Sequence, residues 1–518
     1  MKLFPIRGGI HPEYRKELTS EKVIVALPMP AALYIPLQQH IGAPAEVLVK
    51  EGDLVKKGQM IARNQGAVSA SQHAPTSGRI ASVTEVIAPH PSGLPQTTII
   101  LEPDGKDEWA CLPEPIADPF TATLHEINDR VAQSGIVGMG GAAFPSAIKL
   151  NLGEQKKLDT LLLNGAECEP YLTCDDRVMR EYPGEVIDGA RIMAHALGTP
   201  RVVIGIEQNK PQAIETITKA ASAFPEIEVV TVPVQYPMGS ERHLVQAITG
   251  RETPARKLAA DLGIVVHNVA TARAVHHAVR FGRPLIARVV TVSGGAIREP
   301  NNVLTPIGAR VADLVEFCGG FSARPESVVN GGPMMGQPLA SLEAPVVKGT
   351  SGILALTAEE INDRPANACI RCGSCITVCP CGLSPVDMAA FIRKDNLDVA
   401  ARLGVMDCFS CGSCSYVCPS HIPLVHYFNY AKGVLRELEN DRRKSERIKT
   451  LAEVRTIRIE RAAEAKRAAL AARKPAAGAA PSGAAPSGNV PSGNVPSGNV
   501  PSGNTGEIKA TTEEKVNA

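Results

Sequence analysis

The sequence predicts a multidomain protein of mixed α/β and α+β class, with a cysteine-rich helical module toward its end. Three observations lead to this prediction. The chain has 518 residues, well beyond the ~100–200 of a typical single domain. Short apolar runs alternate with helical segments over residues 126–285, a pattern typical of a mainly parallel sheet. Nine of the 13 cysteines fall between Cys369 and Cys418, so one short segment holds a dense cysteine cluster.

The composition is that of a globular protein without a strong charge excess. Hydrophobic residues make up 44% and charged residues 21%, and 54 basic side chains nearly balance 53 acidic ones. Because nucleic-acid-binding domains are usually basic, we expect no nucleic-acid partner. No apolar run approaches the ~20 residues that span a bilayer, and the N-terminus lacks an apolar signal region. We therefore expect a soluble cytoplasmic protein with at most peripheral membrane attachment, whose clustered cysteines bind metal.

The N-terminal module, residues 1–125, alternates short strands with glycine-centred turns. Residues 45–59 show this pattern, and residues 73–80 echo it. The repeat resembles the barrel-sandwich hybrid of lipoyl- and biotinyl-carrier domains, which carry a modifiable lysine on a hairpin. Here no lysine occurs between Lys57 and Lys106, so we predict a β module used for docking rather than a swinging arm.

The second module, residues 126–285, is predicted to form a parallel sheet with ligands at the carboxyl ends of its strands. A helix is expected at 213–224, with Asn209 as its cap and Pro211 in its first turn. Strands are expected at 161–163, 201–206, 229–232 and 264–266.

Three segments of this module carry residues suited to a nucleotide-like ligand. A glycine-rich stretch at 134–145 leads to Lys149, and glycines let backbone amides approach a phosphate or a flavin ring. Segments 164–170 and 236–242 directly follow expected strands, and their acidic side chains suit hydroxyl groups. A glycine-rich turn by itself is structural about as often as it binds a ligand. The three segments together favour a binding site.

The third module, residues 286–358, opens with an apolar strand at 288–293. Pro306-Ile307-Gly308 then precedes an expected helix at 311–318. This arrangement resembles the soluble-ligand-binding β-grasp domain.

The fourth module, residues 359–435, contains the spacing C-x2-C-x2-C-x3-C-P twice. Three thiolates on a tight turn can hold one face of a cubane, and the fourth cysteine points to the other cluster, as in two-cluster ferredoxins. Structural zinc sites are the alternative, but they rarely use this spacing. We therefore predict two [4Fe–4S] clusters with these ligands: Cys369, Cys372, Cys375 and Cys418 for cluster 1, and Cys379, Cys408, Cys411 and Cys414 for cluster 2. Cys381 is expected to be a spectator thiol.

The C-terminal part is predicted to be a basic helix followed by a disordered tail. Residues 436–474 hold 13 basic and seven acidic residues in a weakly amphipathic, helix-forming composition. Residues 475–518 include a repeated Pro-Ser-Gly-Asn-Val unit, which cannot bury a core and favours a flexible tether.

The motifs of residues 126–285 resemble those of the flavin- and NADH-binding subunit of respiratory complex I. That resemblance implies a Rossmann-like domain that binds FMN and NADH, with glycines giving room, Lys149 countering negative charge and NADH stacking beside Phe144. The implied cofactor-binding residues are Gly138, Gly140, Gly141, Phe144, Lys149, Asn164, Glu167, Gly239, Glu241, Asn268 and Thr271. The sequence departs from the family pattern at Met139, Ala166 and Ser240. No catalytic residue is assigned.

The order of the modules resembles the C subunit of the Rnf (also Rsx) electron transport complexes. The resemblance implies a peripheral subunit on the cytoplasmic side of the inner membrane, with NADH, a ferredoxin-type carrier and the other subunits of the complex as partners. Such complexes couple electron transfer between NADH and ferredoxin to ion translocation. Two alternatives stay open: a free-standing cobalamin reductase of a microcompartment, and a non-catalytic iron–sulfur wire. The basic helix and the tether favour membership of the complex.

Overall fold

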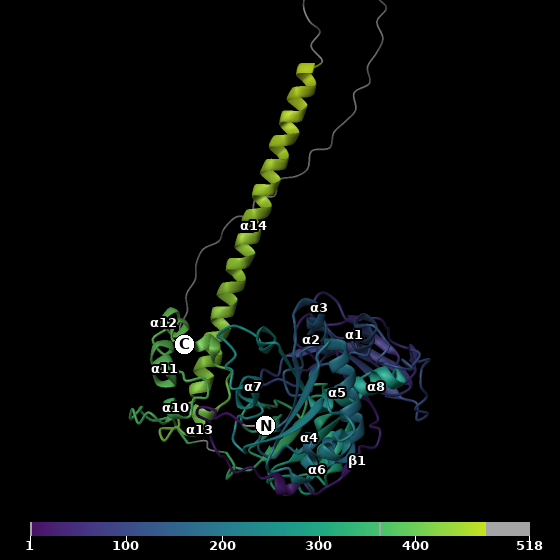
Figure 1. The fold of residues 1–518 in the computed structure, drawn as a ribbon, viewed down its shortest axis with the longest axis vertical. Coiled ribbons are helices and arrows are strands. Elements are labelled where there is room, and N and C mark those ends of the chain that lie inside the picture. Colours follow the sequence, from purple (N-terminus) through teal and green to yellow (C-terminus); the bar gives the residue numbers. More distant parts are fainter. Residues whose placement is uncertain (1–2, 362–363, 473–518) are drawn as a thin grey trace, which may run out of the picture. The chain divides into compact units, whose positions relative to one another are not determined.

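The computed structural model describes residues 3–361 and 364–472 (Figure 1). The chain divides into two compact units after Asn440, within one long helix. The first unit contains the four modules predicted ahead of the basic helix. The predicted disordered tail, residues 475–518, lies outside the described residues.

Two small antiparallel sheets, ordered β2–β8–β7–β4 and β3–β5–β6, form the N-terminal β module. Buried side chains of both sheets, such as Ile61 and Ile99, belong to one hydrophobic core, so the sheets are held together by apolar burial. The strands are β2 (Leu33–Pro36), β3 (Glu46–Val47), β4 (Leu54–Val55), β5 (Met60–Arg63), β6 (Gln72–His73), β7 (Gly78–Ile87) and β8 (Pro95–Pro103).

The α/β module contains a four-stranded parallel sheet in the order β11–β10–β9–β12, as the sequence predicted. Its strands are β9 (Thr160–Gly165), β10 (Arg201–Glu207), β11 (Ile227–Val232) and β12 (Ile264–Asn268). The helices are α1 (Leu124–Gln133), α2 (Ser146–Leu150), α3 (Leu152–Gln155), α4 (Cys174–Glu181), α5 (Pro183–Leu197), α6 (Pro211–Ala221), α7 (Glu241–Thr249) and α8 (Val269–Phe281), with a 3-10 turn η2 (Ala259–Leu262). Helices α5 and α8 pack against each other (Figure 1).

The predicted cap of α6 is wrong. The helix begins at Pro211, as expected, but the preceding residue is Lys210, and no side chain caps the helix. The Lys210 ammonium is buried and bonds instead to the Glu207 carboxylate and the Ala166 carbonyl. Asn209 therefore lies one position too early to cap α6, and the helix ends at Ala221 rather than at Phe224.

A six-stranded sheet, ordered β1–β14–β13–β17–β15–β16, forms the third module. Strand β1 lies near the start of the chain and pairs in parallel with β14, so this sheet joins an N-terminal segment to residues 287–356. Buried Val290 and Ile353 share one core with Leu33 and Ile99 of the N-terminal β module. The elements are β1 (Ile24–Ala26), β13 (Ala287–Ser293), β14 (Asn301–Pro306), β15 (Ser327–Asn330), β16 (Gln337–Pro338), β17 (Gly352–Leu356) and α9 (Val311–Phe317), with η1 (Lys16–Leu18) preceding β1.

The cysteine-rich module is helical and ends in the long helix α14, labelled in Figure 1. Its core is apolar, with Met388 and Phe428 almost fully buried. The predicted basic helix does not begin separately at residue 436, because α14 is continuous from Leu424 to Ala472, and residues 441–472 are exposed. Within the described residues, no helix combines the length and apolar character needed to cross a membrane. The module's elements are α10 (Ser374–Thr377), α11 (Pro385–Ile392), α12 (Leu397–Arg402), η3 (Val405–Asp407), α13 (Ser413–Tyr416) and α14 (Leu424–Ala472).

A buried lysine, Lys348, joins three modules of the first unit. Its ammonium donates to the carbonyls of Ser71 and Gly135, both at 2.7 Å, and its backbone N–H donates to Gln39 at 3.1 Å. The residue is 1% exposed, and burial lowers its pKa to about 7. The same residue therefore fixes the β module and the start of the glycine-rich segment to the third module.

This lysine gives a testable pH dependence. Between about pH 7 and its ordinary pKa of 10.5 the folded protein binds fewer protons at Lys348 than the unfolded chain, so stability should rise with pH in that window. In Lys348→Met the rise should be smaller, whereas Lys394→Met, at an exposed lysine, should keep it. The measurement is the anaerobic thermal unfolding midpoint at several pH values; equal slopes in Lys348→Met and wild type would contradict the assignment.

Candidate functional site

The two cysteine repeats adopt the same local backbone. Arg371 and Ser410, at equivalent positions, have φ of 54° and 61°, and Gly373 and Gly412 have φ of 78° and 84°. The left-handed residues turn their amides toward sulfur: Arg371 N–H donates to Cys369 Sγ and Ser410 N–H donates to Cys408 Sγ, each at 3.4 Å. Because hydrogen bonds stabilise a thiolate, this geometry suits cluster ligands.

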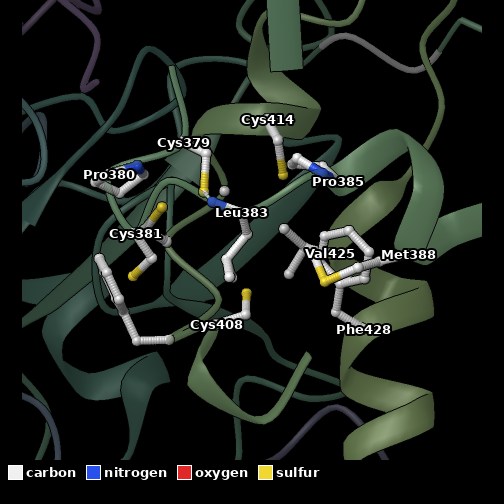
Figure 2. A pocket seen from close by; sticks show the side chains of 13 residues that line it. Cys379, Pro380, Cys381, Leu383, Pro385, Met388, Cys408, Cys414, Val425 and Phe428 are labelled. Carbon is white, nitrogen blue, oxygen red and sulfur yellow. Dashed lines mark hydrogen bonds between the residues drawn. The ribbon is translucent and has the colours of Figure 1, made fainter. Parts of the chain in front are cut away.

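Five cysteines from the two repeats and their flanks line a single cavity: Cys379, Cys381, Cys408, Cys411 and Cys414. We use the name cage 2 for the four that belong to the repeated motif, all except Cys381; Figure 2 labels Cys379, Cys408 and Cys414 of this set around the space. Cys379 belongs to the first repeat and the other three to the second. The surrounding wall is apolar, from Leu383, Pro385, Met388, Val425 and Phe428. Four convergent sulfurs in an apolar pocket fit an iron–sulfur cluster by donor chemistry.

The other four cysteines, which we call cage 1, lie nearer the surface. Cys369 and Cys372 are exposed, while Cys375 and Cys418 are partly buried against the module core. Burial, and then the neighbouring Cys372 and Cys418 thiols, raise the pKa of Cys375. The two cages therefore differ in solvent access, although their sequence spacings are identical.

Cys381 also lines this cavity, although it lies outside the two repeated motifs (Figure 2). Its thiol points to the Asp407 carbonyl at 3.7 Å, and burial raises its pKa to about 12. Burial also raises the pKa of Cys414, which is a proposed ligand, so the pKa does not distinguish Cys381 from the ligands. The spectator role of Cys381 stays a prediction.

The glycine loop, residues 138–145, forms an open turn at the edge of the parallel sheet. Gly138 N–H donates to the Phe144 carbonyl at 2.8 Å and closes the turn. Met139 N–H donates to the Thr271 hydroxyl at 2.9 Å. Gly140 and Gly141 are exposed, and Gly141 has φ of +105° with nothing within 4 Å of where a Cβ would lie. An exposed, left-handed glycine backbone of this kind fits a ligand that needs close approach.

Lys149 and Glu241, two predicted site residues far apart in sequence, form an ion pair in the same α/β module as the glycine loop. The Lys149 ammonium donates to a Glu241 carboxylate oxygen and to the Val266 carbonyl, both at 3.0 Å. Both side chains are partly exposed, at 30% and 40%. The pair is therefore accessible to a ligand and places a positive charge at the carboxyl end of β12.

Asn164 and Glu167 bond to the protein's own backbone. The Asn164 amide donates to the Gly239 carbonyl at 2.7 Å. The Glu167 carboxylate accepts the N–H groups of Asp175 and Asp176, at 2.7 and 3.1 Å, at the start of α4. The two side chains shape the segment in this structure, and their expected contact with ligand hydroxyls stays a prediction.

Asn268 and Thr271 anchor the loop through α8. Asn268 caps that helix by accepting the Ala270 N–H at 2.8 Å, and its amide donates to Asp175 at 2.7 Å. A Cβ added at Gly140 would lie 3.4 Å from Asn268, so the loop and the start of the helix are in van der Waals contact. The structure thus brings together Gly140, Asn268 and Thr271, three residues that the motif comparison selected.

Two charged residues at this site were missed by the sequence prediction. Arg288 is 2% exposed, and its guanidinium donates to the Lys348 carbonyl and, at 3.5 Å, to the Met139 carbonyl. Asp175 is buried beside Asn268, and burial raises its pKa to about 7. One sequence feature could have drawn attention to Arg288: it is a single charged residue within the otherwise uncharged strand β13.

Cage 2 packs directly on the α/β module. The Tyr236 hydroxyl donates to the Cys411 carbonyl at 2.6 Å. His243 Nε2 lies 3.2 Å from the Pro380 carbonyl, and its ring lies 5.5 Å from that of Phe409. His243 follows Glu241 by two residues on α7, so a single helix turn joins the Lys149–Glu241 pair to cage 2.

Comparison with known proteins identifies the domains that contain the two candidate sites. Family models match the RnfC barrel-sandwich hybrid domain at residues 4–106, the Nuo51 FMN-binding domain at 131–277, the SLBB domain at 289–338 and a 4Fe-4S dicluster domain at 368–422. The chain is 57% identical over 442 residues to the C subunit of the ion-translocating oxidoreductase complex of Rhodobacter capsulatus, covering 85% of each chain. It is 45% identical to the C subunit of the proton-translocating ferredoxin:NAD(+) oxidoreductase complex of Clostridium ljungdahlii, covering 82% of this chain and 93% of that one.

Fold and sites together define an electron-transfer flavoprotein with two iron–sulfur clusters. The chain belongs to the family of C subunits of ion-translocating oxidoreductase complexes, with an FMN-binding domain and a 4Fe-4S dicluster domain. The predicted family, the predicted fold class and the two predicted cofactor types are thereby confirmed.

Proposed function

We propose that this chain exchanges electrons with NADH at its FMN-binding domain and relays them through cluster 2 and then cluster 1 to a partner within a membrane-bound complex. The observation that carries this order is the contact of cage 2 with the α/β module through Tyr236 and His243. Cage 1, with Cys369 and Cys372 exposed, is the cage open to an external partner. The direction of net flow depends on the potentials of the two partners.

The residues of the α/β module fit a flavin nucleotide. Gly140 and Gly141 offer exposed backbone amides, and the Lys149 ammonium offers a positive charge. Thr271 holds the loop in place through Met139 N–H. When bound, FMN supplies the conversion between two-electron hydride chemistry and single-electron transfer. The protein's contribution is position and charge, with Phe144 proposed beside the nicotinamide.

The ligand sets proposed for the clusters are those of the two cages. Cage 2 gives Cys379, Cys408, Cys411 and Cys414, and cage 1 gives Cys369, Cys372, Cys375 and Cys418. Each set takes three cysteines from one repeat and the fourth from the other, so both clusters form only when the repeats fold together.

Cofactor content is the first test. We expect ~8 iron and ~8 acid-labile sulfide per chain, together with flavin that fluoresces after release from the anaerobically purified protein. Clusters without flavin would support a non-catalytic wire, and zinc without sulfide would contradict the cluster assignment. Co-purification with shell proteins rather than integral membrane proteins would support the free-standing reductase.

Attachment to the membrane is proposed to occur through partner subunits on the cytoplasmic side, assisted by the basic helix. Segment 436–474 carries 13 basic against seven acidic residues, and the described part of it is largely exposed, so it can attract anionic lipid. We expect the chain in the membrane fraction when the other subunits are co-expressed, and in the supernatant when they are omitted. Recovery in the supernatant in both cases would exclude stable attachment.

A further inference from the structure

Lys432, on the third turn of α14, is buried although it carries a charge. The residue is 6% exposed, and its ammonium donates to the Ser410 hydroxyl at 2.7 Å. Among the described residues no carboxylate lies within ion-pair distance of this ammonium. Burying an ammonium is costly unless a negative group lies nearby, so a neutral hydroxyl alone does not account for this position.

The surroundings of Lys432 are positive rather than negative. Together with Arg242 and Arg436 it lines a hollow of about 450 Å³, which we call the basic hollow. The lining includes one carboxylate, Asp407, whose oxygen accepts the Arg256 backbone N–H at 3.3 Å. The compensating negative charge must therefore come from another part of the wall.

That part of the wall is cage 2. Cys408 and Phe409 line both the basic hollow and the cluster cavity, so the two spaces adjoin each other at these residues. Ser410, the hydrogen-bond partner of Lys432, donates its own N–H to Cys408 Sγ at 3.4 Å. Four thiolates leave a [4Fe–4S] centre with net negative charge, and reduction adds one further negative charge. The buried ammonium thus places a fixed positive charge close to Cys408 on this side of cage 2.

The internal repeat provides a natural comparison. Lys432 lies 14 residues after Cys418, and Arg393 lies 14 residues after Cys379. Arg393 is exposed at the end of α11, so water screens its charge. Two motifs of identical spacing therefore differ in whether the basic residue of the following helix is buried.

We propose that the Lys432 ammonium is the counter-charge of cluster 2 and raises its reduction potential by stabilising the reduced, more negative form. The proposal rests on the ligand sets given above. Net charge and hydrogen bonding to sulfur are established determinants of cluster potential. Lys432 acts through the cluster and touches no substrate, so it is a positioning residue for the electron path from the flavin domain.

The experiment is a redox titration of the purified, cluster-loaded full-length chain, followed by electron paramagnetic resonance. In Lys432→Met the midpoint reduction potential of one of the two clusters should become more negative by about 59 mV. This shift corresponds to about a tenfold change in the equilibrium constant of a one-electron reduction. Lys432→Arg should retain the wild-type value, and Arg393→Met should leave both midpoints unchanged. Loss of one cluster in Cys379→Ser identifies which signal belongs to cluster 2.

The outcomes separate this proposal from the function it rests on. Full iron content with both midpoints unchanged in Lys432→Met would overturn the role of Lys432 and leave the relay intact. A shift in the cluster 1 midpoint would overturn it as well. If wild-type protein contained no second cluster, the proposed relay itself would fail. Should Lys432→Met lose iron, Lys432→Gln, which keeps a hydrogen-bond donor without the charge, supplies the same comparison.

Discussion

Replacing Cys379 with serine is expected to destroy the cluster built by the second cysteine repeat, not the one next to it in sequence. Cys379 lies in the first repeat, but its sulfur lines the cavity of Cys408, Cys411 and Cys414. Iron should fall from ~8 to ~4 per chain, because one cubane loses a ligand while the other keeps all four. The measurement is iron and sulfide content together with the electron paramagnetic resonance spectrum of the reduced protein.

Comparison of Cys379→Ser with three further variants makes this test specific. Cys379→Ser and Cys408→Ser should lose the same signal, whereas Cys369→Ser should lose the other one. Cys381→Ser, which alters the neighbouring thiol bonded to Asp407, should keep both clusters. If Cys379→Ser instead lost the same signal as Cys369→Ser, each repeat would hold its own cluster and the proposed ligand sets would be wrong.

Replacing Lys149 with alanine is expected to abolish NADH-driven reduction of the clusters while leaving the iron content unchanged. The variant removes the positive charge of the proposed flavin site and leaves Glu241 without its 3.0 Å ion pair. An uncompensated carboxylate would then repel the phosphate groups of both nucleotides. Stopped-flow absorbance after mixing with NADH measures the reduction, and dithionite should still reduce both clusters.

Lys156→Ala is the matched control for this variant. Lys156 lies in the same module and also forms an ion pair with an acidic side chain, Asp261, but no motif places that pair at the ligand site. Its NADH-driven reduction rate should match that of wild type. Wild-type kinetics in Lys149→Ala would remove Lys149 and Glu241 from the proposed site and leave the clusters unaffected.

The structure also changes how the acidic residues after β9 are understood. The motif comparison placed Glu167 against ligand hydroxyls, but its carboxylate accepts the first backbone amides of α4. The Lys16 ammonium donates to the carbonyls of Glu167 and Glu169 in the same segment. The segment is therefore held by buried bonds from a residue near the start of the chain, which no local pattern indicates.

Local spacing by itself determined the cluster module and the parallel sheet. Three cysteines at two-residue gaps occupy one tight turn, and the structure repeats that turn with Arg371 and Ser410 in the same left-handed conformation. Apolar runs of three to six residues likewise determined where β9 to β12 lie. These features depend on backbone geometry over a few residues, so the sequence predicts them without knowledge of the remaining fold.

Tertiary structure alone decided which distant groups meet. Three features join residues that no sequence motif relates to one another. They are the pairing of β1 with β14, the burial of Lys348 between three modules, and the position of Lys432 beside Cys408. The difference between Lys432 and Arg393 shows the reason. Equivalent basic residues follow equivalent cysteine motifs, but packing buries one and leaves the other in water. Because the cost of a buried charge depends on its three-dimensional neighbours, that distinction becomes visible only in the folded chain.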